Sequence, residues 1–162
     1  MDPFFLSRDE TCLVVVDVQE RLIPAMEPET ARRGLGRIAT LIRGFRILGL
    51  PTLVTQQYTR GLGPTVPELR EHLGGVEPIE KTTFSCLREE SFRRAFAALS
   101  RRAVVLVGIE AHVCGLQTAL DLLAPRHLVY IAADAVFSRA AADRRVALDL
   151  ASQAGAVVTC SE

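Results

Sequence analysis

The sequence has no tryptophan, few aromatic residues and no net charge. Aromatic residues make up 6% of the 162 residues, and 19 basic side chains balance 19 acidic ones. Without a net charge there is no overall field to attract nucleic acid or an anionic membrane, so we expect neither as a partner. No apolar run approaches the roughly 20 residues that span a bilayer. Residues 1–10 also lack the pattern of a signal peptide, and we therefore expect a cytoplasmic protein.

Paired cysteine motifs are absent as well. The four cysteines, Cys12, Cys86, Cys114 and Cys160, are far apart and show no CxxC spacing. Reduced thiols are therefore expected. The length and the 49% hydrophobic content suit a single domain over residues 1–162, large enough to fold without disulfides or metals. No GxGxxG motif follows the first apolar run, which makes a dinucleotide-binding role the weakest alternative.

What the sequence does contain is a regular alternation of apolar runs and helical patterns. Strand-like runs occupy residues 12–18, 51–55, 76–81, 103–107, 128–131 and 156–158. Helical spacing of apolar residues occupies residues 29–48, 89–99, 113–123 and 141–153, with a Gly- and Pro-rich loop over 59–67. Continuous β-branched runs are typical of strands buried on both faces. The pattern predicts an α/β fold, a three-layer, Rossmann-like parallel sheet.

Three reactive side chains follow strands, at the edge where such sheets bind ligands. They are Asp17, Lys81 and Cys114. Alone, each has a plainer interpretation: a turn former, a surface lysine and a small buried hydrophobe. Together they could form a nucleophile, a base and a cation, and a thiol in the first turn of a helix is expected to ionise readily. Cys86, close to Lys81 in sequence, is the second candidate for the nucleophile.

The sequence resembles the isochorismatase-like cysteine hydrolase superfamily through three motifs in this order. They are Asp17-Val18-Gln19, Lys81-Thr82-Thr83-Phe84-Ser85 and Gly108-Ile109-Glu110-Ala111-His112-Val113-Cys114. The segments Gln57-Tyr58 and 61–69 resemble the subgroup of isochorismatase domain-containing proteins. That subgroup usually has Glu-Gln-Tyr-Pro where this chain has Gln56-Gln57-Tyr58-Thr59.

The resemblance implies a six-stranded sheet of order 3-2-1-4-5-6 and a catalytic triad of Asp17, Lys81 and Cys114. It implies a cis peptide bond before Glu110, with the Glu110 and Cys114 N–H groups forming an oxyanion hole. The expected activity is hydrolysis of a C–N bond in a small amide, ureide or carbamoyl compound through a thioester. No cofactor is expected, and the expected assembly is a homo-oligomer.

Four further residues are candidates for substrate contact, namely Gln19, Tyr58, Phe84 and His112. Phe84 is equally compatible with core packing, and His112 with a surface turn. The aspartate and histidine cluster that places a metal in nicotinamidase-type relatives has no counterpart after residue 58, so no metal site is expected. Two other functions stay open: a non-catalytic scaffold on this fold, and a redox sensor in which Cys86 resolves an oxidised Cys114.

Overall fold

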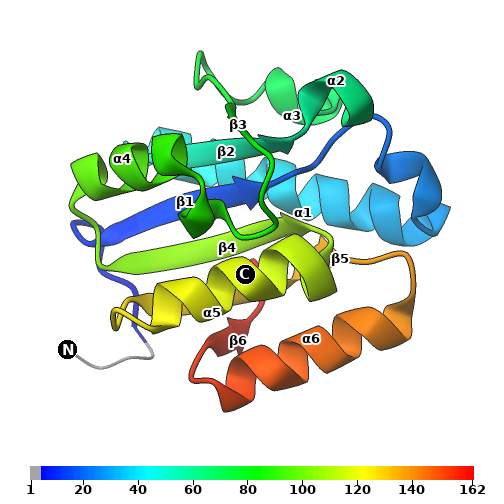
Figure 1. Ribbon diagram of the computed structural model, residues 1–162. Coiled ribbons are helices and arrows are strands. Elements are labelled where there is room, and N and C mark those ends of the chain that lie inside the picture. Colours follow the sequence, from blue (N-terminus) through cyan, green and yellow to red (C-terminus); the bar gives the residue numbers. More distant parts are fainter. Residues whose placement is uncertain (1–4) are drawn as a thin grey trace.

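A six-stranded parallel sheet forms the centre of the molecule (Figure 1). The computed structural model describes residues 5–162; the start of the segment in which we expected no signal peptide lies outside this range. The strand order is β3-β2-β1-β4-β5-β6, and every neighbouring pair is parallel. The strands are β1 (Thr11–Val16), β2 (Thr52–Gln57), β3 (Ile79–Lys81), β4 (Ala103–Ile109), β5 (Leu128–Phe137) and β6 (Val157–Thr159). The expected fold class and strand order are both confirmed.

Helices cover both faces of this sheet and complete the three layers. The α-helices are α1 (Pro28–Ile47), α2 (Thr59–Leu62), α3 (Pro67–Arg70), α4 (Glu90–Leu99), α5 (Leu116–Leu123) and α6 (Ala141–Gln153). Short turns of other helix types are η1 (Ile23–Ala25), η2 (Cys86–Arg88) and the π-helical turn η3 (Ala111–Gly115). Helix α1 packs on one face, whereas α4, α5 and α6 pack on the other (Figure 1).

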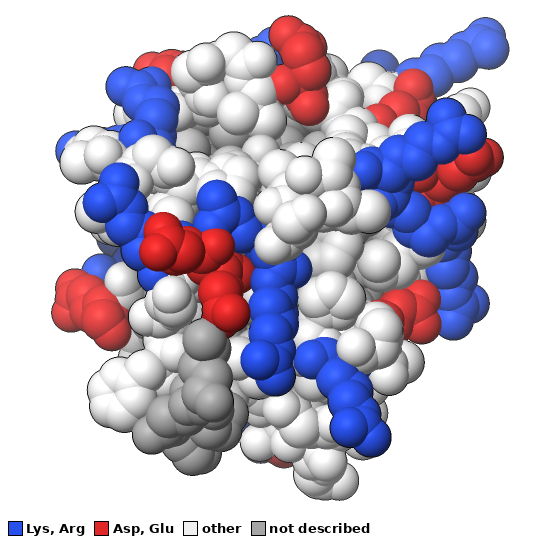
Figure 2. Space-filling view, turned by 90° about the vertical axis from the view of Figure 1, so that its left-hand side faces the viewer, with Lys and Arg blue, Asp and Glu red and all other residues white. Residues whose placement is uncertain are grey.

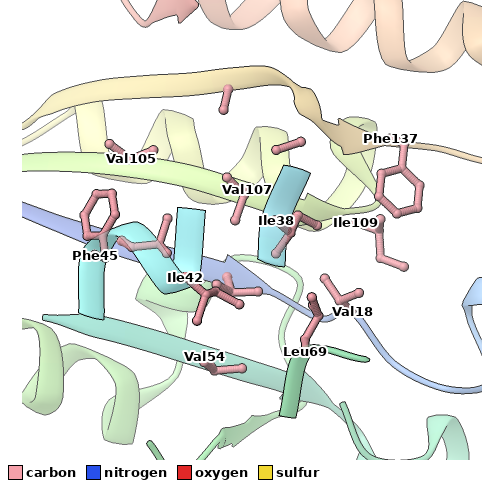
Figure 3. Packing of buried hydrophobic residues seen from close by; sticks show 14 of the residues in the cluster. Val18, Ile38, Ile42, Phe45, Val54, Leu69, Val105, Val107, Ile109 and Phe137 are labelled. Atoms are coloured by element: carbon pink, nitrogen blue, oxygen red, sulfur yellow. The ribbon is translucent and has the colours of Figure 1, made fainter. Parts of the chain in front are cut away.

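Alternate residues of each central strand supply two separate hydrophobic cores. In β1, Leu13 and Val15 join the core beneath α1, while Val14 and Val16 join the core beneath α4, α5 and α6. Figure 3 shows the first of these cores, where side chains of α1 meet those of the strands. All six residues of β1 and all seven of β4 are buried, which explains their continuous apolar sequence.

Gly108 lets the backbones of β1 and β4 approach closely beside the carboxyl edge of the sheet. It has φ +118°, and a Cβ built on it would lie 2.1 Å from the carbonyl oxygen of Val16. Only glycine tolerates that contact in that conformation. The close approach places the residues that follow β1 next to those that follow β4.

The opposite end of the molecule, where the strands begin, carries charges of both signs (Figure 2). Figure 2 shows the end at which the strands begin, where basic and acidic side chains are interspersed. Over residues 5–162, none of the helices combines the length and the apolar character needed to cross a membrane.

Candidate active site

Asp17 directly follows β1 and is completely buried at the carboxyl edge of the sheet. Its backbone has φ +50°, and its N–H donates to the carbonyl of Thr55. Oδ1 accepts a 2.7 Å hydrogen bond from Thr55 Oγ1. Oδ2 lies 2.6 Å from Lys81 Nζ in a buried ion pair, and the carboxylate also has a side-chain hydrogen bond with the Cys114 thiol. The carboxylate therefore lies next to the thiol proton.

Lys81 ends β3 and is 1% exposed. Nζ donates to Gln57 Oε1 at 2.7 Å and to the carbonyls of Thr83 and Phe84 at 3.0 Å each. These bonds use the three protons of an ammonium group. Burial alone would lower the pKa of Lys81, but Asp17 and the neighbouring thiols raise it above the ordinary value. The lysine is therefore a fixed cation.

Cys114 lies in η3 and is 7% exposed. The N–H groups of Val113 and Gly115, on either side of it, both donate to the carbonyl of Glu110 at 3.1 Å. The peptide bond between Ile109 and Glu110 is cis. We expected Cys114 in the first turn of a helix over residues 113–123. Instead α5 begins at Leu116, and the cysteine belongs to the π-helical turn that precedes it.

The expected readily ionised thiol is not what the structure supports. Burial raises the pKa of Cys114 above its ordinary value, and the negative charge of Asp17 raises it further, whereas Lys81 lowers it. Desolvation therefore outweighs the attraction of the lysine. The raised pKa favours the protonated thiol at rest, beside a carboxylate and an ammonium.

Cys86, the second candidate, is buried in the same cluster. Its Sγ lies 3.8 Å from Thr55 Oγ1, and its backbone N–H donates to Thr118 Oγ1 at 3.0 Å. Burial raises the pKa of this thiol to about 11. Cys86 is fully enclosed, whereas Cys114 retains a small exposed surface.

The candidate substrate residues fall into two groups. Tyr58 and Phe84 expose 52% and 54% of their surfaces, and both are bound to Lys81 through their backbones: Tyr58 N–H donates to the Lys81 carbonyl, and the Phe84 carbonyl accepts from Nζ. Gln19 is instead completely buried. Its amide bonds the N–H and carbonyl of Gln57 and the carbonyl of Gly63. The side chain therefore joins the end of β2 to the loop after α2, and both of its amide protons are used within the protein.

His112 and Glu110 are tied to the segment after β5. His112 Nδ1 lies 3.0 Å from Ser138 Oγ, and the Glu110 carboxylate binds Arg139. His112 therefore braces the turn against the segment after β5, and its contact with a substrate stays a prediction.

Thr55, Gln57 and Arg139 contact the site residues but were not identified from the sequence. Thr55 and Arg139 belong to no motif, and Gln57 belongs only to the Gln57-Tyr58 resemblance, which assigned no role to it. The position of Thr55 and Gln57 at and just after the end of the predicted second strand was the available signal that they lie near the edge.

The two departures from the subgroup pattern are hydrogen-bonded to each other. Gln56 Nε2 donates to Thr59 Oγ1 at 3.1 Å, and Gln56 Oε1 accepts from the N–H and hydroxyl of Thr65. The Thr59 N–H, which a proline would lack, donates to Glu80 Oε1 at 2.9 Å. Gln56 thus has a structural role beside the site.

Among the described residues, no group of three or more His, Cys, Asp or Glu side chains is placed to hold a metal ion. The fold and the cluster of thiol, carboxylate and ammonium define a class of α/β proteins with a buried cysteine at the carboxyl edge of a parallel sheet. The isochorismatase domain, as a sequence family, matches residues 11–162. The chain belongs to the isochorismatase family.

Individual relatives agree with this membership. Isochorismatase domain-containing protein 1 of Salmo salar is 41% identical over 152 residues, which cover 94% of this chain and 53% of the relative. The chain therefore spans about half of that protein. The structure named MAR1 ribonuclease from Caenorhabditis elegans is 38% identical with a TM-score of 0.84, covering 96% of this chain and 79% of that one. The YcaC gene product of Escherichia coli, described as an octameric hydrolase of unknown specificity, is 25% identical with a TM-score of 0.87, covering 97% and 78%.

Proposed function

We propose that this protein is a cysteine hydrolase that cleaves a C–N bond of a small amide, ureide or carbamoyl compound. Family membership supports a hydrolase. The observation that carries the proposal is the buried Asp17–Lys81 ion pair at 2.6 Å, whose charges both act on the Cys114 thiol. A buried charge pair is costly to maintain, which favours a catalytic use over a purely structural one.

In the proposed reaction, Asp17 accepts the thiol proton as the sulfur of Cys114 bonds to the carbonyl carbon. Concerted transfer is required because burial and Asp17 hold the pKa of the thiol high. The backbone N–H groups of Glu110 and Cys114 bind the oxyanion. The C–N bond then breaks, Asp17 returns the proton to the leaving nitrogen, and water attacks the resulting thioester with Asp17 again as the base.

Lys81 holds the carboxylate in place through the 2.6 Å ion pair, and its bonds to Gln57 and to two backbone carbonyls fix the ammonium there. Its positive charge stabilises the Asp17 carboxylate before the proton transfer and the developing thiolate during it. Tyr58 and Phe84, half exposed beside Lys81, are the proposed walls of the substrate pocket.

The proposal also covers the substrate, the cellular location and the assembly of the enzyme. A small-molecule substrate in the cytoplasm suits four free cysteines, one of which must stay reduced to react. A homo-oligomer is proposed because the octameric YcaC protein shares the fold over nearly the whole chain. Exposed aromatic side chains at Tyr58 and Phe84 are suited to a site completed by a second subunit.

Two alternatives receive less support. A redox sensor needs an accessible thiol with a lowered pKa, whereas burial raises the pKa of both Cys114 and Cys86. The name of the Caenorhabditis elegans relative includes ribonuclease, but phosphodiester cleavage gives no obvious role to a neutral thiol beside a carboxylate. The geometry favours attack on a carbonyl.

The decisive experiment combines a substrate panel with trapping of the intermediate. Small amides, ureides and carbamoyl compounds are incubated with the parent, Cys114→Ser and Cys160→Ala, and release of amine or ammonia is measured. Acid quenching followed by mass spectrometry should find the acyl group on Cys114. Cys160 is exposed and follows the edge strand β6, which β5 separates from β4, so its variant should match the parent.

We expect Cys114→Ser to lose at least about 100-fold in turnover, since an alcohol is a far weaker nucleophile at this site. Turnover that survives in Cys114→Ser, or an acyl group carried by another residue, would overturn the proposal.

A further inference from the structure

Arg139, which follows β5, binds the carboxylate of Glu110 through hydrogen bonds and an ion pair. The backbone N–H of Arg139 donates to Glu110 Oε2 at 3.0 Å, and Nε donates to the same oxygen at 3.1 Å. Nη2 lies 3.1 Å from Oε1. Glu110 is 9% exposed, so a nearly buried carboxylate is bound by a two-pronged guanidinium and a backbone donor.

The backbone of the same glutamate is bonded to the residues that flank the cysteine. The Glu110 carbonyl accepts the N–H groups of Val113 and Gly115, both at 3.1 Å. Glu110 therefore connects Arg139, through its side chain, to both neighbours of Cys114, through its carbonyl. A shift of Glu110 would move the thiol and the backbone donors together.

A second contact links the same two segments. His112 Nδ1 lies 3.0 Å from Ser138 Oγ, and Nε2 lies 3.8 Å from Asp143 Oδ2. The turn that carries Cys114 is thus braced at two points by residues 138–143. Of these two links, only the Arg139–Glu110 pair consists of several charge-assisted hydrogen bonds.

We propose that Arg139 is a positioning residue that fixes Glu110 so that its N–H and the Cys114 turn are preorganised for the oxyanion. This inference rests on the proposed function. Preorganisation matters because donors must already point at the charge when it develops. The guanidinium also neutralises the Glu110 carboxylate, whose negative charge would otherwise oppose the oxyanion.

The Arg139 side chain is 62% exposed, and the backbone N–H of residue 139 donates to Glu110 Oε2 whatever the side chain is. The carboxylate therefore keeps one of its donors in Arg139→Met, and urea unfolding of that variant checks that it folds. Arg145 is an exposed arginine on α6, so Arg145→Met is the matched control.

The test compares two reactions of Cys114 in each variant. Acylation by p-nitrophenyl acetate forms an oxyanion, whereas alkylation by iodoacetamide is a displacement at carbon that forms none. We expect Arg139→Met to slow acylation by about 10- to 100-fold, as misplaced catalytic groups do, while alkylation changes less than about 3-fold. Arg139→Lys should recover part of the acylation rate, and Arg145→Met should match the parent.

The outcomes separate this inference from the function on which it rests. If Cys114 of the parent is not acylated, the proposed function and the role of Arg139 are both overturned. If the parent is acylated and Arg139→Met reacts equally fast, or if acylation and alkylation fall together, the positioning role alone is overturned.

Discussion

At the scale of single residues, the resting state of Cys114 is the feature with the most direct consequences. Thiol nucleophiles are commonly activated by ionising before they react. Here burial and Asp17 both raise the pKa of the Cys114 thiol, and the Asp17 carboxylate has a side-chain hydrogen bond with it. In the proposed mechanism the same carboxylate disfavours the thiolate at rest and accepts the thiol proton during attack.

Asp17→Asn should consequently have opposite effects on two measurements. Losing the negative charge lowers the pKa of Cys114, so alkylation by iodoacetamide at pH 8 should become faster. Hydrolysis of a substrate should fall by about 100- to 10,000-fold, because no base accepts the proton. Lys81→Met should slow alkylation, since the lysine lowers the pKa of the thiol.

Folding needs its own control, because each single substitution leaves one charge buried without its partner and costs about 3–5 kcal/mol. The double variant Asp17→Asn/Lys81→Met removes both charges and should be more stable than either single one in urea unfolding. Slower alkylation in a folded Asp17→Asn protein would contradict this account of the site.

At the scale of elements, two of the three glycines in helix α1 lie in opposite surroundings. A Cβ on Gly34 would lie 2.5 Å from two ring carbons of Phe137, whereas one on Gly36 would meet nothing within 4 Å. Phe137 ends β5 and is 1% exposed, so its ring cannot move aside easily. Gly34 thus sets how closely α1 approaches the sheet near the candidate site.

The two alanine substitutions should therefore change stability in opposite directions. Gly36→Ala should raise the free energy of unfolding by about 0.5–1 kcal/mol, the usual gain in helix propensity. Gly34→Ala should lower it by about 1–3 kcal/mol, because the methyl group overpacks against the ring. Urea titrations of both variants measure this, and Phe137→Leu should relieve the loss in a Gly34→Ala background. Equal effects at both positions would refute the packing argument.

Elements buried on both faces could be predicted from the sequence, and those defined by backbone geometry could not. Continuous β-branched runs located β1 and β4 because burial on both faces selects such residues. The second half of β5, from Ala132 to Phe137, escaped prediction because its Ala-Ala-Asp-Ala sequence has little strand character. The π-helical form of η3 has no signature that would distinguish it from the start of α5.

The residues of the candidate site likewise divide into those that could be predicted from the sequence and those that could not. Asp17, Lys81 and Cys114 could be identified because each follows a strand and parallel strands end at one edge. Gln19 was expected to face a substrate, yet its amide satisfies backbone groups at the end of β2 and in the loop after α2, and no local pattern encodes that loop conformation. The role of Arg139 depends equally on the parallel pairing of β4 with β5, which places Phe137 opposite Ile109 and Arg139 against Glu110.

At the scale of the whole molecule, the buried thiols make the fold sensitive to alkali. Burial raises the pKa of Cys12 to about 12 and that of Cys86 to about 11, and it raises the pKa of Cys114 as well. In the unfolded chain a thiol has a pKa of about 8.5. Above that pH the unfolded state loses these protons while the folded state keeps them, so unfolding becomes more favourable.

The stability that these thiols contribute is therefore complete below about pH 8 and is lost between about pH 9 and pH 12. Each thiol should add up to about 1.4 kcal/mol per pH unit to the fall in the free energy of unfolding. Urea unfolding at pH 8 to 11 under reducing conditions measures that slope. Cys12→Ala should make the slope shallower by about one proton even though it loses packing at every pH. A slope that Cys12→Ala does not alter would mean that the Cys12 thiol ionises as easily in the folded protein as in the unfolded chain, and that the sheet interior admits a charge there.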